Sequence, residues 1–129
     1  MRREVLEAYL FGSRAADAAT PLSDVDVAVY VDPRLAPAPA SPYGYAADLS
    51  AALGQGLGRR DVDVLVLNTA PPLLYHRVLA GGVRIISRDL RATTTREGRA
   101  LSRYCDYVPQ LRRIDAALRA RLEAGTFGR

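Results

Sequence analysis

Short apolar runs divide the first two thirds of the chain into predicted strands and helices. Four runs of five to seven residues are rich in valine, isoleucine and leucine, and such runs are typical of β-strands. Segments with helical spacing of leucine lie between the later runs. The predicted strands are Val5–Phe11, Val25–Val31, Val62–Leu67 and Val83–Ser87, and the predicted helices are Asp48–Leu57 and a segment from Pro71-Pro72 to Gly81-Gly82.

Beyond residue 88 the apolar positions recur every three or four residues, which predicts an amphipathic helix. Thr94 and Glu97 have the spacing of a capping box at its start. Pro109 predicts a kink, or a break into two helices, near Tyr107–Pro109. Cys105 lies along the apolar stripe and is predicted to be a small core residue. The stripe consists of Leu101, Tyr104, Val108, Leu111, Ile114, Leu118 and Leu122.

These elements predict a single α/β (α+β) domain with a small mixed sheet flanked by helices. Its core spans residues 1–88, and a C-terminal helical segment, residues 89–129, packs on that core. A chain of 129 residues can bury one sizeable core without disulfides. No apolar run approaches the roughly 18 residues of a membrane span, and the chain has one cysteine. We therefore expect a cytoplasmic protein without a membrane partner.

All 18 positively charged side chains are arginine. They are unevenly distributed, because residues 1–87 hold eight arginines against nine acidic residues, a net charge of −1, whereas residues 88–129 hold ten against five, a net charge of +5. The body is thus nearly neutral and the C-terminal segment is basic. This distribution weakens the case for nucleic acid as a partner, which a pI of about 9.6 would otherwise raise.

Candidate chemistry lies around the first two strands. Gly12 and Ser13 follow the first strand, where backbone N–H groups and a hydroxyl can bind phosphate, and Arg14 adds a donor fork suited to phosphate. Ten residues later come Asp24 and Asp26, which point the same way on a strand and repel each other unless a cation lies between them. Carboxylates are the ligands that Mg²⁺ prefers. The pattern therefore predicts a site for a nucleoside triphosphate with magnesium.

A third carboxylate on a neighbouring strand could complete a two-metal site and orient or deprotonate an attacking hydroxyl. Asp61 and Asp63 are both candidates.

The strings LFGSR, SDVDVAV and VDVLVLN closely resemble the minimal nucleotidyltransferases of the DNA polymerase β superfamily, whose signature is Gly-Ser, ten residues, Asp-x-Asp and a later strand aspartate. The stretch from residue 61 to 89 and the following LSRYCDYVPQLRRID resemble MntA-type adenylyltransferase antitoxins, the partners of HEPN-domain ribonuclease toxins. The resemblance covers nearly the whole chain and implies a nucleotidyltransferase fold.

By this resemblance, the chain transfers AMP from ATP to a tyrosine hydroxyl of a HEPN toxin and so neutralises it. The resemblance makes Gly12 and Ser13 the phosphate-binding pair and Asp24 and Asp26 the magnesium ligands. It favours Asp63 as the third carboxylate, with Asp61 as the alternative. Mg²⁺ and ATP are the expected cofactor and substrate.

Two other functions stay open at this point. The protein could be a nonenzymatic antitoxin that neutralises its toxin by binding alone through the basic segment. It could also transfer a nucleotide to a small molecule such as an aminoglycoside, although the chain lacks a sizeable second domain to hold one.

Overall fold

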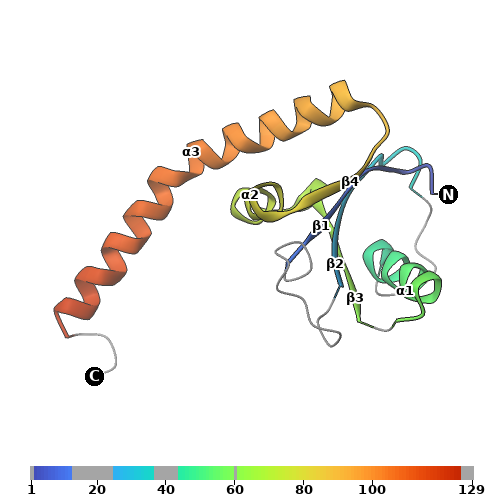
Figure 1. Ribbon diagram of the computed structural model, residues 1–129. Coiled ribbons are helices and arrows are strands. Elements are labelled where there is room, and N and C mark those ends of the chain that lie inside the picture. Colours follow the sequence, from blue (N-terminus) through green and yellow to red (C-terminus); the bar gives the residue numbers. More distant parts are fainter. Residues whose placement is uncertain (1, 13–24, 37–43, 60, 126–129) are drawn as a thin grey trace.

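The computed structural model describes residues 2–12, 25–36, 44–59 and 61–125. Within them, four strands form one sheet in the order β3-β2-β1-β4 (Figure 1). β1 pairs antiparallel with both β2 and β4, and β2 pairs parallel with β3, so the predicted mixed sheet is confirmed. The strands are β1 (Val5–Phe11), β2 (Val25–Val31), β3 (Val62–Val66) and β4 (Val83–Ser87). Their bounds agree with the sequence prediction, except that Leu67 begins a short 3₁₀ turn, Leu67–Thr69.

Helix α1 (Tyr45–Leu57) covers one face of the sheet (Figure 1). Val27, Val29 and Val31 of β2 point to this face because side chains alternate along a strand, and they pack in one cluster with Leu49 of α1. The helix ends at Gly58, whose φ of 67° lies in the left-handed region that favours glycine. It also makes the crossover between the parallel strands β2 and β3.

The opposite face of the sheet is covered by α2 (Pro72–Gly81) and the first half of α3 (Leu90–Glu123). Tyr9 and Ala28 of the sheet form a buried cluster here with Tyr75 and Val78 of α2 and Ala100 of α3. Proline stands in the first turn of α2, where its missing N–H costs no helical hydrogen bond.

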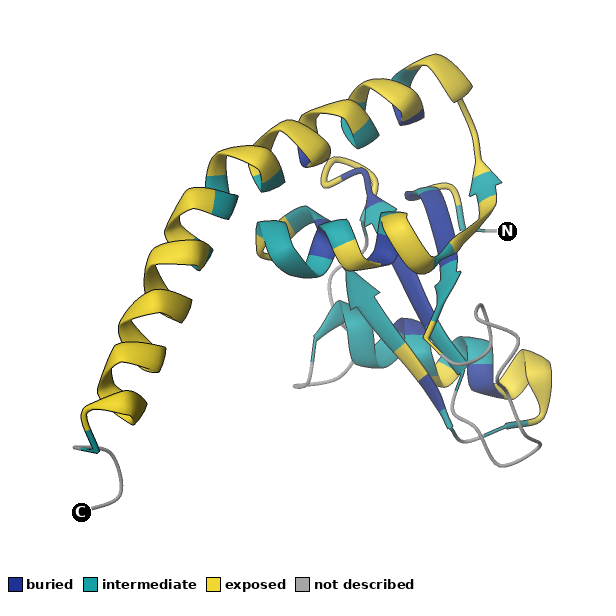
Figure 2. Ribbon diagram, turned by 60° about the vertical axis from the view of Figure 1, so that its left-hand side comes forward, coloured by how far each residue is buried: buried dark blue, intermediate teal, exposed yellow. Residues whose placement is uncertain are grey.

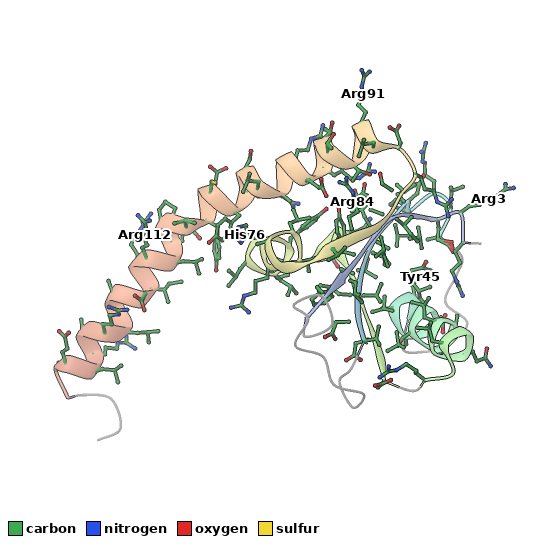
Figure 3. The ribbon with its side chains drawn as sticks, viewed as in Figure 1. Arg3, Tyr45, His76, Arg84, Arg91 and Arg112 are labelled. Atoms are coloured by element: carbon green, nitrogen blue, oxygen red, sulfur yellow. The ribbon has the colours of Figure 1, made fainter. Side chains whose placement is uncertain are left out.

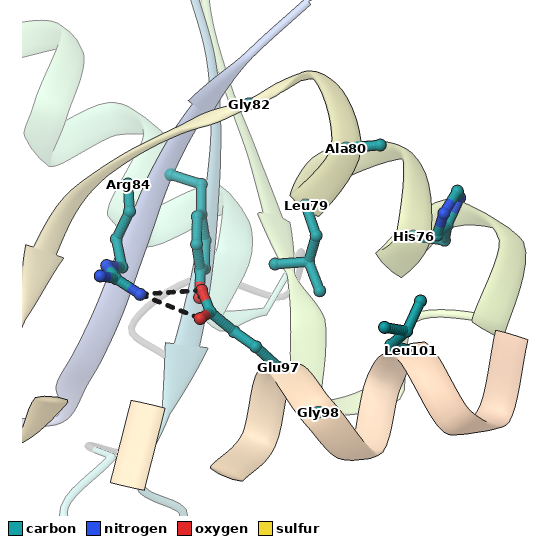
Figure 4. A pocket seen from close by; sticks show the side chains of 9 residues that line it. His76, Leu79, Ala80, Gly82, Arg84, Glu97, Gly98 and Leu101 are labelled. Carbon is teal, nitrogen blue, oxygen red and sulfur yellow. Dashed lines mark hydrogen bonds and ion pairs between the residues drawn. The ribbon is translucent and has the colours of Figure 1, made fainter. Parts of the chain in front are cut away.

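Two polar contacts fix α3 to the sheet. The Arg96 guanidinium forms an ion pair with Glu7 of β1, whose carboxylate is fully buried, and its Nε donates to Glu7 Oε1 at 2.5 Å. Glu97 accepts a hydrogen bond from the Tyr9 hydroxyl at 2.8 Å. It accepts another from Arg84 of β4 at 2.9 Å (Figure 4). These contacts pair the buried carboxylate of Glu7 with Arg96 and the half-buried carboxylate of Glu97 with Arg84, and so they fix the position of the first half of α3.

The structure corrects two expectations for α3 and decides between two alternatives for a third. The helix begins at Leu90, and Asp89 caps it by accepting from the backbone N–H groups of Arg91 and Ala92 at 3.1 and 3.3 Å, so the predicted capping box at Thr94 is wrong. Of the two alternatives at Pro109, the kink is confirmed and the break is not, because one helix continues to Glu123 and bends between its two halves (Figure 1). Cys105 is exposed rather than part of the core.

The second half of α3 is exposed almost throughout (Figure 2). In the described part of the chain, no helix is both long and apolar enough to cross a membrane.

Candidate active site

Three strands bring the described candidate residues to one end of the sheet. β1 ends at Phe11, next to Gly12, while β2 and β3 begin at this same end because they run antiparallel to β1. Phe11 lies opposite Asp26 in the β1–β2 register. The turn after β1 is therefore adjacent to the first residues of β2.

Asp26 and Asp63 are direct register partners on the parallel strands β2 and β3. Adjacent strands lie about 4.8 Å apart, so two carboxylates at paired positions on one face can share a cation. Asp26 lies two residues before Ala28, and Asp63 two before Leu65, and both of these residues pack on the face covered by α2. Asp63 is exposed and Asp26 is half-buried, which leaves the pair accessible from solvent.

Gly12 places its backbone against the carboxylate of Asp26. Its φ is 77°, a conformation that side chains disfavour, and a Cβ atom built there would collide with Asp26 Oδ2. Glycine is thus required at this turn for two reasons, backbone conformation and space. The backbone groups of this turn therefore lie directly beside a carboxylate, an arrangement that suits a phosphate brought in with a cation.

Asp61, unlike Asp63, is bound by a neighbouring arginine. It precedes β3, and Arg59 binds its carboxylate in a bidentate way, with Arg59 Nε donating to Oδ1 at 2.6 Å and the terminal nitrogen pairing with Oδ2. Its backbone carbonyl accepts a hydrogen bond from Val25 N at 2.9 Å, which ties the start of β3 to the start of β2. Asp61 therefore has contacts that support the local fold.

The remaining candidates, Ser13, Arg14 and Asp24, lie outside the described residues. Among the described residues, no three acidic, histidine or cysteine side chains gather closely enough to hold a metal ion. Asp26 and Asp63 supply two carboxylates of the kind that Mg²⁺ binds, and they are register partners on one face of the sheet, so these residues fit that cation.

Glu7, a buried acid on the same face of the sheet, was not among the residues that the sequence pattern predicted to be functional. Its position inside the apolar run VLEAYLF was the available signal, since a charged residue is rarely buried unless it is paired. Its partner Arg96 also lies over the ring of Tyr30, 4.7 Å from the ring centroid. This cluster positions α3 and lies away from the end of the sheet that carries Asp26.

A family model described as polymerase beta, nucleotidyltransferase, matches residues 1–91. The chain belongs to the polymerase beta nucleotidyltransferase family. The match spans all four strands and both shorter helices, including every candidate site residue. No curated protein sequence matches the chain significantly.

Solved structures with the same fold come from toxin–antitoxin complexes. One is a rebuilt and re-refined structure of tri-AMPylated Shewanella oneidensis HEPN toxin in complex with MNT antitoxin, with a TM-score of 0.64 and 21% identity over 90% of this chain and 85% of that chain. A second is a toxin–antitoxin with AMP-PNP, with a TM-score of 0.58 and 20% identity over 95% and 87%.

A third is a mutant of the toxin–antitoxin pair MntA–HpeT in which two aspartates, two residues apart, are replaced by glutamate. Its TM-score is 0.58, with 18% identity over 96% of this chain and 88% of that chain. At these identities the three likenesses establish a shared fold that extends through α3.

Proposed function

We propose that this chain is a magnesium-dependent protein adenylyltransferase that transfers AMP from ATP to a tyrosine hydroxyl of a HEPN toxin and thereby neutralises the toxin. The observation that carries the proposal is the register pairing of Asp26 with Asp63 beside the turn at Gly12, in a chain of the nucleotidyltransferase family. Fold neighbours that include an AMPylated toxin and an AMP-PNP complex support this choice of nucleotide and partner.

In the proposed reaction the tyrosine oxygen attacks the α-phosphorus of ATP. An O–P bond forms, the bond from the α-phosphorus to the bridging oxygen of the β-phosphate breaks, and pyrophosphate leaves with that electron pair. Mg²⁺, when bound, supplies charge neutralisation for the triphosphate and the leaving group. Positioning and charge neutralisation are the main demands of such a transfer, so no histidine base is needed.

We assign the site residues as follows. Asp24, Asp26 and Asp63 hold the cation, and Asp63 also orients the attacking hydroxyl and accepts its proton. Gly12, Ser13 and Arg14 bind the phosphates. Asp63 is preferred to Asp61 because Asp63 is the register partner of Asp26, whereas Asp61 is bound by Arg59.

The test incubates the purified chain with ATP, Mg²⁺ and its toxin and measures the intact mass of the toxin. We expect the added mass of AMP with the wild type, and a loss of at least about 100-fold in rate with Asp26→Asn or Asp63→Asn, since each removes a charged ligand. Asp61→Asn is the matched control and retains transfer. Absence of transfer by the wild type, or wild-type rates in Asp26→Asn, contradicts the proposal.

A nonenzymatic antitoxin is the second candidate, and the exposed second half of α3 favours it because that surface suits a binding partner. The two functions separate in cells. Under the enzymatic proposal, Asp26→Asn no longer protects cells that express the toxin, although the variant is folded and abundant. Full protection by Asp26→Asn supports binding alone.

A further inference from the structure

The second half of α3 presents an apolar surface that the described part of this chain does not cover. We define the distal stripe as Val108, Leu111, Ile114, Leu118 and Leu122. Ile114, Leu118 and Leu122 are 53%, 48% and 59% exposed, whereas the first half of α3 is anchored to the sheet through Arg96 and Glu97. Helical stability in proteins comes mostly from packing of an apolar face, so this half of the helix is expected to pack against the surface of a binding partner.

The spacing of the distal stripe suits a helix as its partner. Leu111 and Leu118 are seven residues apart, and Val108 and Leu122 are fourteen apart, which places them on the two alternating positions of a heptad seam. Asp115 interrupts the seam and forms an ion pair with Arg119 at 3.1 Å. Residues 108–123 span about 24 Å of helix, enough for four turns of contact with one partner helix.

Charge beside the distal stripe selects among partners. Arg112 and Arg119 flank one side of the seam and Arg121 flanks the other, and residues 108–123 hold four arginines against two acidic residues. Figure 3 shows Arg112 standing clear of the rest of the protein. A second copy packed antiparallel would place Arg112 opposite Arg119, and one packed parallel would place Asp115 opposite Asp115 in the seam; like charges in either arrangement destabilise a helix pair. A helix whose apolar seam is flanked by carboxylates is complementary to this surface.

We propose that the distal stripe docks onto an amphipathic helix of the toxin whose apolar seam is flanked by Asp or Glu. This inference rests on the proposed function for the identity of the partner. In Figures 1 and 2 the second half of α3 continues on the α2 side of the sheet, the side that carries Asp26 and Asp63. A toxin bound there lies on the same side of the sheet as the reacting groups.

The experiment measures the affinity of the full chain for the toxin by titration calorimetry and, separately, AMP transfer by intact mass. Leu111→Glu with Leu118→Glu places charges on the distal stripe, and we expect the dissociation constant to rise at least about 30-fold. Arg112→Glu with Arg119→Glu is expected to raise it about 10-fold and to reduce its dependence on salt. Ala116→Glu with Ala120→Glu adds the same charge on the opposite, exposed face of the helix and leaves affinity unchanged.

All substituted positions except Leu111 are exposed and that residue is half-exposed, so circular dichroism and thermal denaturation should match the wild type. Wild-type affinity in the Leu111→Glu, Leu118→Glu variant overturns the docking proposal. Failure of the wild type to bind the toxin overturns it too. A wild-type dimer in light scattering that Leu118→Glu converts to a monomer shows that a second copy covers the stripe and likewise overturns it.

The two proposals fail differently. If the wild type binds through the distal stripe but adds no AMP, docking stands and the enzymatic function falls. If the wild type adds AMP and the stripe variants bind as the wild type does, the enzymatic function stands and docking falls.

Discussion

Gly12 is the residue at which backbone conformation and site chemistry depend on each other most directly. Its positive φ turns the chain at the end of β1, and the absence of a Cβ lets the backbone lie against the Asp26 carboxylate. One methyl group there affects both the turn and the carboxylate. Asp26 is also the residue that is paired in register with Asp63 on the neighbouring strand.

Gly12→Ala should therefore reduce AMP transfer by at least about 10-fold and lower the free energy of unfolding by about 1–2 kcal/mol, because alanine disfavours this backbone conformation and its methyl group displaces Asp26. Steady-state kinetics and urea denaturation measure the two effects. Gly56→Ala is the control, since a Cβ at that helical position meets nothing within 4 Å. Unchanged kinetics in Gly12→Ala would falsify the role assigned to this turn.

At the level of elements, α3 divides into an anchored half and an exposed half. Thr93 and Ala100 are buried, and Arg96 and Glu97 bind groups on the sheet. His76 of α2 stacks on Tyr104 with ring centroids 3.6 Å apart, which continues the contact toward the middle of α3. From residue 112 to residue 124 every residue is exposed.

Ending the chain after Gln110 should leave the fold intact. We expect the midpoint of thermal denaturation to change by no more than about 3 °C, because the side chains described for residues 111–125 bury little surface in this chain. Differential scanning calorimetry provides the measurement, with the full chain alongside. A decrease of about 8 °C or more would show that the exposed half of α3 stabilises the core.

The sequence predicted the strands well because valine-rich runs with a period of two identify buried strands. It also predicted a third carboxylate on a strand neighbouring Asp26, with Asp61 and Asp63 both open, and the β2–β3 register pairs Asp63 with Asp26. It could not predict the strand order β3-β2-β1-β4, which depends on pairing between distant segments. The capping box at Thr94 and the core position of Cys105 were wrong because periodicity identifies a helix face without saying where the helix begins or what covers that face.

For the whole molecule, the two buried tyrosines of the core determine how stability responds to alkaline pH. Burial is the largest cause that raises the pKa of both groups. It raises the pKa of Tyr9 well above its ordinary range and the pKa of Tyr75 to about 12. The folded state thus keeps protons that the unfolded state releases near pH 10. The stabilising contribution is complete below about pH 10 and is lost as the pH rises toward 12.

We expect the free energy of unfolding, measured by urea denaturation at pH 8, 10 and 11, to decrease as the pH rises. Because the chain has no lysine, ammonium groups of side chains do not titrate in the same range. In Tyr75→Phe the free energy of unfolding should decrease less steeply with pH. It should differ little from the wild type at pH 8, since the described residues offer the buried Tyr75 hydroxyl no hydrogen-bond partner. Tyr9→Phe also loses the hydrogen bond to Glu97 and should cost about 1 kcal/mol. An identical decline in Tyr75→Phe would contradict the assignment.

The order of the strands separates the paired aspartates from the strand that leads into α3. β2 and β3, which carry Asp26 and Asp63, lie at one side of the sheet, whereas β4, which leads into α3, lies at the other edge with β1 between them. From residue 112 to residue 123 α3 is exposed, so substitutions there leave the packing of the strands that hold the paired aspartates unchanged. Replacing this stretch with the corresponding stretch of a relative should change which toxin the protein binds, while the AMP-transfer reaction stays the same.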